Sequence, residues 1–263
     1  MASLRPFGED FFCIYNKNLL FNLLKRNLKL KYRQSYLGIL WTILVPALNA
    51  LIYFFVFKNV LRVGIENYFL FVLSGLMPWQ FFSSAVLQSI ESMTMNANLI
   101  NKVPVPPRVF PYAEMNTVFI NYLLSLPILL GVAIYSKDSF SVQNFSLIFY
   151  SALLYLQAYG MALAASTTFI YLRDLRHILS IILQAWFYLT PIVYNQGMLP
   201  EKLYWVEYVN PVGIIFHGIH ETFVYNRALD IEKNLIAIAW TLFVMLFGFW
   251  VYLRAKKNIV ENL

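Results

Sequence analysis

The histidines are the side chains best suited to acid–base or metal chemistry. His217 and His220 are three residues apart, which places both on one face of a helix, and Glu221 is the adjacent carboxylate. A zinc site draws several ligands from Cys, His, Asp and Glu, and the single cysteine, Cys13, is remote from this pair in the sequence. We therefore expect no metal site and no catalytic residue, and we interpret the histidines as packing or interfacial side chains.

A pair of glycines has the spacing of a phosphate-binding loop but not its chemistry. Gly213 and Gly218 are followed by Ile219 and His220, where such a loop needs Lys and Ser or Thr to reach the phosphates and magnesium. We expect no cofactor in this chain. If the protein uses ATP, a separate polypeptide must bind both ATP and Mg.

The composition is that of an integral membrane protein. Hydrophobic residues make up 60% of the 263 residues and charged residues only 13%, about half the share in soluble domains. Six apolar stretches approach the roughly 20 residues of a spanning helix, at 38–57, 68–87, 115–135, 145–171, 178–194 and 235–253. The predicted fold is one all-α membrane domain over 1–263, with a segment 1–37, a six-span bundle 38–253 and a tail 254–263.

The six predicted spans contain no Asp, Glu, Lys, Arg or His. Proton- and ion-coupled carriers keep ionisable groups inside the membrane to bind and release the ion, so this class is disfavoured. Amide side chains are present instead, and we interpret them chiefly as hydrogen-bonding links between helices. They are Asn49, Gln80, Gln88 (just past the second span), Asn116, Asn121, Gln157 and Gln184.

The basic residues set the orientation and account for the net charge of +7. With the N-terminus inside, the cytoplasmic segments hold 14 Lys and Arg residues and the external segments 6. This bias predicts that both termini are cytoplasmic. Because the basic residues flank apolar spans, we attribute them to orientation and anionic headgroups rather than to nucleic acid.

Residues 11–33 have the pattern of an amphipathic helix on the cytoplasmic surface. Asp10 can cap it, and Phe12, Tyr15, Leu19, Leu20, Leu23 and Leu24 recur at helical spacing. The basic residues of this segment attract anionic headgroups. A role toward a substrate is a further hypothesis for the same basic residues. These candidates are Lys25, Arg26, Lys29, Lys31 and Arg33. The alternative is a basic topology anchor with no further role.

Residues 195–234 contain two apolar pieces, neither long enough to span a membrane. Asn210 and Pro211 resemble a helix start, with Asn as the cap and Pro at the first helical position. The pattern predicts short re-entrant helices that dip into the outer leaflet, which requires burial in protein or a cavity lining. An ordinary external loop over the bundle is the alternative.

The loop over 92–108 predicts a short polar helix that Pro104, Pro106 and Pro107 stop. A plain connecting loop is the alternative. With this loop the sequence resembles the permease subunit of ABC-2 type polysaccharide exporters. The resemblance rests on three stretches, which are RNLKLKYR (26–33) with SYLGILW (35–41) and Pro46; GLMPWQFF (75–82) with NLINK (98–102); and WFYLTPIVY (186–194) with Leu199-Pro200 and Asn210-Pro211. Ile219-His220 departs from the aromatic-Arg pair of many relatives.

The resemblance implies a homodimer of six-span permeases with two separate ATPase subunits in a bacterial inner membrane. The substrate would be a polymer on undecaprenyl diphosphate, such as O-antigen, capsule or teichoic acid. The amphipathic helix would border the substrate entrance, where its basic residues would attract the lipid diphosphate, since phosphate pairs well with Lys and Arg. Residues 195–234 would form an external gate. A coupling helix would sit in a cleft of the ATPase. Its residues would be Asn96, Asn98, Leu99, Ile100, Asn101 and Lys102.

Aromatic residues are the candidates for a sliding path for sugar rings, because flat rings are tolerant surfaces. They are Tyr53, Trp79, Phe81, Trp186, Tyr188 and Tyr194, for each of which belt or packing roles are the alternative. Two other functions remain open from the sequence. One is ABC-2 export of a small drug or antibiotic. The other is a membrane-embedded transferase, for which no polar catalytic cluster is evident.

Overall fold

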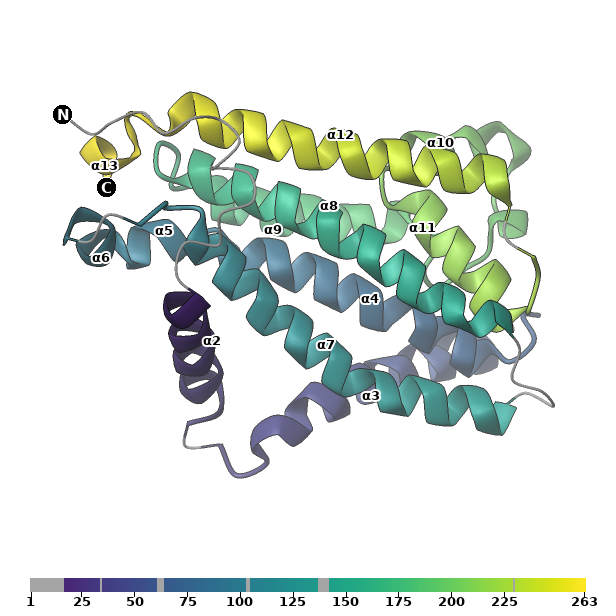
Figure 1. Cartoon of the computed structure of the whole chain (residues 1–263). Helices are drawn as coiled ribbons and strands as arrows, with labels where there is room; N and C mark the ends of the chain where they lie inside the picture. The colour runs from purple at the N-terminus through teal and green to yellow at the C-terminus, as the bar shows by residue number, and fades with distance from the viewer. Residues whose placement is uncertain (1–16, 34, 61–63, 103–104, 137–141, 229) are drawn as a thin grey trace.

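The computed structural model describes residues 17–33, 35–60, 64–102, 105–136, 142–228 and 230–263. Within these ranges all regular structure is helical, without a strand. Long helices lie side by side along one direction, and α2 (Lys17–Tyr32) runs across them (Figure 1). The predicted all-α membrane class is confirmed.

Five helices among the described residues are long and apolar enough to cross a membrane. They cover the first, second, third, fourth and sixth predicted spans. They are α3 (Trp41–Phe54), α4 (Tyr68–Ser89), α7 (Val109–Ser136), α8 (Ser146–Phe169) and α12 (Ile231–Ala255). The turn η1 (Gly38–Leu40) precedes α3 and η2 (Phe55–Val60) continues it, while η3 (Val142–Phe145) precedes α8.

The fifth predicted span is only partly helical. Helix α9 (Leu175–Leu189) has 15 residues and rises about 22 Å, which is less than the roughly 30 Å of a bilayer core. It ends where the sequence predicted, because Thr190 is extended ahead of Pro191. The count of six spans is therefore not confirmed by helix length.

The chain around α9 nevertheless follows the whole length of α4. At one end, Arg176 forms an ion pair with Glu91, just beyond the last residue of α4. At the other, Tyr68, the first residue of α4, donates a hydrogen bond of 2.7 Å to the carbonyl of Val193. The residues after α9 turn at Ile192, where its N–H donates to the Thr190 carbonyl at 2.7 Å, and they reach the first turn of α4.

The core is built around α4, most of whose residues are buried, whereas in α3 only Pro46 and Ala50 are buried. Helices α7 and α8 flank α4, and α12 packs along α8. Two glycines allow that last contact, because a Cβ on Gly248 would lie 2.0 Å from the carbonyl oxygen of Gly160. Helix α3 is peripheral and leaves most of its apolar side chains exposed.

The two ends of the bundle differ in structure (Figure 1). One end carries α5 (Ser92–Met95), α6 (Ala97–Lys102) and α13 (Ile259–Asn262), and we call it the α6 end. The other carries α10 (Trp205–Val209), α11 (Gly213–Gly218) and η6 (Ile219–Val224), and we call it the α11 end. The short turns η4 (Gln196–Met198) and η5 (Glu201–Leu203) precede α10.

The segment 195–234 forms short helices, as the sequence predicted. The Asn210 side chain accepts a hydrogen bond from the backbone of Val212 at 3.1 Å, but α11 begins at Gly213. The prediction that Pro211 is the first helical residue is wrong, because Pro211 lies in the turn before the helix. Ile214, Ile215 and Phe216 are at most 1% exposed, so this segment is buried in protein. Such burial is what a re-entrant segment requires.

Candidate functional site

Lys25, Arg26, Lys29 and Lys31 of α2, with Arg33 just after it, are exposed but have different neighbours. Lys31 lies on the side of the helix that faces α7, near the Glu114 carboxylate. Arg26 instead donates a hydrogen bond of 3.1 Å from its guanidinium to the Asn96 side chain, between α5 and α6. The predicted cap Asp10, together with Phe12, Cys13 and Tyr15, lies outside the described residues.

A polar link also fixes α2 to α7. The Asn27 side chain donates to the Glu114 carboxylate at 2.8 Å, and the Tyr32 hydroxyl donates to Asn121 at 2.6 Å. Partial desolvation lowers the pKa of Lys31, and the nearby Glu114 carboxylate opposes this shift. The prediction that Asn121 links helices is confirmed, with α2 as its partner.

A groove opens between the end of α2 and helices α3, α4 and α7. It has a volume of about 240 Å³ and combines an apolar wall with amide and hydroxyl groups. Lys31 and Tyr32 stand at its α2 side, and Gln80 and Gln88 contribute from α4. The groove therefore offers apolar surface beside a cation, which suits an amphiphilic ligand.

Helix α6 has one exposed face and one packed face. Asn98, Asn101 and Lys102 are exposed, whereas Ile100 is 6% exposed. Ile100 packs in a cluster that includes Ile259 of α13. The predicted short helix is confirmed over Ala97–Lys102, while Pro104 lies outside the described residues. An exposed polar face on a firmly packed short helix suits a protein contact.

The predicted aromatic residues divide into two groups. Trp79 lies 6.4 Å from Trp186 and 5.8 Å from Phe187 between ring centroids, and Tyr53 lies 5.8 Å from Phe187. Phe81 instead faces α7, with its ring 5.4 Å from Tyr122. Trp79 and Phe81 are buried, so in this conformation they pack within the chain.

Tyr188 is 59% exposed, and Tyr194 donates a hydrogen bond to its carbonyl at 2.9 Å. Phe187, which the sequence reasoning missed, joins Tyr53, Trp79 and Tyr188 in one cluster. Its position inside the aromatic run 186–188 is the sequence feature that could have identified it.

A buried polar contact joins α9 to the segment before α11. Trp186 donates its indole N–H to Asn210 at 2.8 Å, and the Asn210 amide donates to the Thr190 hydroxyl at 2.9 Å. Gln157 makes a second link, with its amide 3.0 Å from the Pro211 carbonyl and 3.1 Å from the Thr241 hydroxyl. These bonds place the α10–α11 turn against α8, α9 and α12.

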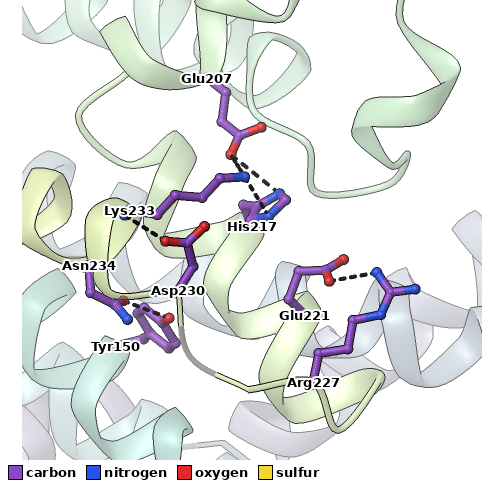
Figure 2. A network of polar contacts seen from close by, with 8 residues as sticks. All are labelled: Tyr150, Glu207, His217, Glu221, Arg227, Asp230, Lys233 and Asn234. Atoms are coloured by element: carbon purple, nitrogen blue, oxygen red, sulfur yellow. Dashed lines mark hydrogen bonds and ion pairs between the residues drawn. The ribbon is translucent and has the colours of Figure 1, made fainter.

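A network of charged and polar side chains gathers at the α11 end (Figure 2). Glu207 is 5% exposed, and its carboxylate lies 3.3 Å from His217 and 3.5 Å from Lys233. The Lys233 ammonium is 3.0 Å from Nε2 of His217. Because an ammonium only donates, Nε2 must accept and the ring proton of neutral His217 lies on Nδ1, facing Glu207.

The protonation of both histidines is disfavoured. Burial lowers the pKa of His217, with the Glu207 carboxylate opposing the shift and the Lys233 ammonium adding to it. Burial likewise lowers the pKa of His220 to about 3. The His220 ring stacks on Phe71 at 3.7 Å and has Nε2 3.2 Å from the Phe71 carbonyl. The two histidines therefore face different neighbours, and the described residues contain no group of three or more metal ligands.

Further members of the network shape the outer edge of the α11 end (Figure 2). Glu221 and Arg227 form an ion pair at 2.7 Å, and Tyr150 donates to Asn234 at 2.8 Å. Asp230 caps α12 by accepting from the backbone of Lys233 at 3.2 Å. The sequence singled out His217, His220 and Glu221 but not Glu207 or Lys233, whose meeting depends on how α10, α11 and α12 fold together.

The apolar helices, the charge-poor core and the polar groups at both ends define a multi-pass membrane protein. Its family follows from comparison with known proteins. The family model "ABC-2 type transporter" matches residues 18–224, and the chain belongs to this family. The matched region includes α2, α6 and the short helices of the α11 end.

Named relatives are similar over nearly the whole chain. The O-antigen export system permease protein RfbA of Klebsiella pneumoniae is 32% identical, covering 95% of this chain and 98% of the relative. The protein of the same name from Myxococcus xanthus is 34% identical, with coverage of 88% and 90%. The polysialic acid transport protein KpsM of Escherichia coli is 25% identical, with coverage of 91% and 94%.

Proposed function

We propose that this protein is the membrane permease of an ATP-driven exporter of lipid-linked polysaccharide. The observation that carries the proposal is the similarity over 95% of the chain to a protein named as an O-antigen export permease. The groove beside α2 supports it, since it combines apolar walls with the cation of Lys31. A lipid diphosphate needs both features.

ATP hydrolysis in this proposal takes place on separate ATPase subunits that bind ATP and Mg. The exposed face of α6, with Asn98, Asn101 and Lys102, is the proposed docking surface. In this proposal a displacement of α6 by the ATPase is transmitted to α2 through the Arg26–Asn96 contact and to α9 through the Arg176–Glu91 ion pair. The α6 end thereby connects the ATPase to both the entrance helix and the aromatic cluster.

The substrate path in this proposal starts at α2. Exposed Lys25 and Lys29, with Lys31 and Arg33, draw the diphosphate to the membrane surface, since charge-assisted contacts to phosphate are strong. The aromatic residues Tyr53, Trp186, Tyr188 and Tyr194 give the sugar chain flat surfaces to pass over. Trp79 and Phe81 are buried in this conformation and support these rings from behind.

The assembly is proposed to be a homodimer with two ATPase subunits in a bacterial inner membrane. The exposed apolar face of α3, on which Leu48, Leu51 and Ile52 are each at least 50% exposed, is the proposed contact with the second copy. Six passes and cytoplasmic termini follow if α9 and residues 190–193 together complete the fifth crossing beside α4. The α10–α11 segment then forms the external gate.

Deletion of the gene in its host tests the proposed function. We expect the surface polysaccharide to disappear and lipid-linked polysaccharide to accumulate inside the cell, with both defects repaired by the wild-type gene. Immunoblots of whole cells and of extracted lipid-linked glycan measure the two pools. A normal surface polysaccharide together with hypersensitivity to small hydrophobic drugs would favour the drug-export alternative.

A further inference from the structure

A polar cavity of about 590 Å³ opens at the α11 end. The segment before α4, the residues after Pro191, and η6 with the loop behind it form its wall. Its volume lies within the roughly 300–1,000 Å³ of small-molecule sites in proteins. A second cavity of about 290 Å³ shares the lining residues His217, Glu221 and Arg227 with the first.

Several lining groups of this cavity contact one another. Glu221 and Arg227 form an ion pair at 2.7 Å at the rim, where the Arg227 side chain is 67% exposed. The Tyr225 ring is held with the Arg227 guanidinium 5.3 Å from its centroid and the Phe71 ring 6.3 Å away. The Tyr225 ring, placed between these neighbours, loses less freedom on binding a ligand than a free side chain would.

One acceptor on the cavity wall lacks a protein partner. The side-chain oxygen of Asn195 is buried and makes no hydrogen bond with the residues that the structure describes. Buried polar atoms are nearly always paired, so an unpaired one needs a ligand or water. The oxygen is covered in this conformation, so the Asn195 side chain must turn toward the cavity before a hydroxyl group of a bound molecule can donate to it.

The charges of the lining select the class of ligand. The charged lining residues are Glu66, Glu221 and Arg227, of which Glu221 and Arg227 are paired, and the Lys58 ammonium lies 3.5 Å from the carbonyl of the lining residue Ile65. Arg227 is thus the one lining cation among the described residues and already has a carboxylate partner, which does not suit a phosphate or diphosphate, and a hydrocarbon tail would leave these charges desolvated and unpaired. A neutral, hydroxyl-rich molecule can donate to the carboxylates, accept from the guanidinium and lay its C–H groups on Tyr225.

We propose that this cavity is a saccharide-binding site that holds a short segment of the exported glycan at the α11 end. The inference rests on the proposed export of polysaccharide and assigns a binding site to the sugar chain, apart from the basic α2 that faces the diphosphate. The two ends of the bundle thus divide the two parts of a lipid-linked glycan between them by charge.

Direct binding to the purified chain in lipid nanodiscs tests this site. The probes are oligosaccharides of about two to six sugars, released by mild acid from the host's own surface polysaccharide, and inorganic pyrophosphate. Saturation-transfer NMR and a fluorescence titration measure binding. We expect the oligosaccharides to bind the wild-type chain. We expect binding to weaken about tenfold in Tyr225→Leu and in Asn195→Leu, and less in Tyr225→Phe, which keeps the ring.

Tyr135→Leu is the matched control, because Tyr135 is 93% exposed on α7 and does not line the cavity. The elution profile and melting temperature identify variants that fail to fold. Absence of oligosaccharide binding to a wild-type chain that supports export would overturn the saccharide site and leave the proposed function standing. Equal binding by all the folded variants, or displacement of the oligosaccharide by pyrophosphate, would also overturn it. A chain that supports no export would instead refute the proposed function.

Discussion

Neutral His217, between Glu207 and Lys233, makes the stability of the α11 end depend on pH. The folded state lowers the pKa of His217 and of His220, so the unfolded chain binds more protons below the ordinary histidine pKa of about 6.5. Stability is therefore complete above that pH and falls as the pH drops below it. At pH 5.5 we expect a loss of up to about 1.4 kcal/mol for each histidine.

Melting temperatures of the purified protein between pH 8 and pH 5 check this expectation. His217→Gln should reduce the dependence of the melting temperature on pH, because glutamine can still accept a hydrogen bond from Lys233 but does not titrate. His177→Gln is the matched control, since His177 is exposed and should leave the dependence unchanged. A melting temperature that stays constant down to pH 5 would contradict the assigned neutral state.

Arg26 has a role distinct from that of the neighbouring lysines, because it contacts Asn96. Exposed charge-assisted contacts contribute about 0.5 kcal/mol, so Arg26→Gln should lower the glycan exported per ATP hydrolysed roughly twofold. Asn96→Ala should have a similar effect, and the double variant should be no worse than either single one. Lys25→Gln should instead reduce export and ATP turnover together. Fully additive effects of Arg26→Gln and Asn96→Ala would show that the contact does not couple the two elements.

At the scale of elements, the close crossing of α8 and α12 depends on two glycines. A Cβ on Gly248 would lie 2.0 Å from the Gly160 carbonyl oxygen, and backbone cannot yield as a flexible side chain can. We expect Gly248→Ala to destabilise the protein by about 1–3 kcal/mol through overpacking, measured as a lower melting temperature. Gly131→Ala in α7 is the control, because its Cβ would meet nothing within 4 Å. If both variants melt like the wild type, the helices are farther apart than described.

The elements could be predicted from the sequence where local chemistry decides their limits. Runs of apolar residues located five of the helices, and Pro191 located the end of α9. The α9 length could not be predicted, because the apolar run continues through Ile192 and Val193, where the helix has ended, the backbone turns and the Val193 carbonyl accepts from Tyr68. The Glu207–His217–Lys233 contacts also escaped prediction, since they come from three different helices.

At the scale of the whole molecule, the bundle has a polar α6 end, an apolar middle and a charged α11 end. This arrangement is what we expect of an export permease that works with partners. In the proposed function the permease is inactive alone, because ATP is hydrolysed on a separate subunit, and the exposed face of α6 is not covered by the described part of the chain. The ATPase should therefore bind at the α6 end, and Asn101→Arg with Asn98→Arg on that face should abolish its copurification. Retention of the ATPase by this double variant would place the contact elsewhere.

The most direct test of the central claim is transport by a reconstituted complex. The chain is purified with the ATPase that copurifies from its host, inserted into liposomes, and supplied with fluorescent glycan linked to undecaprenyl diphosphate. We predict that the glycan crosses to the other leaflet only when ATP and Mg are present and only when both subunits are included. Movement of the glycan by this chain alone, or no movement by the active complex, would contradict the account.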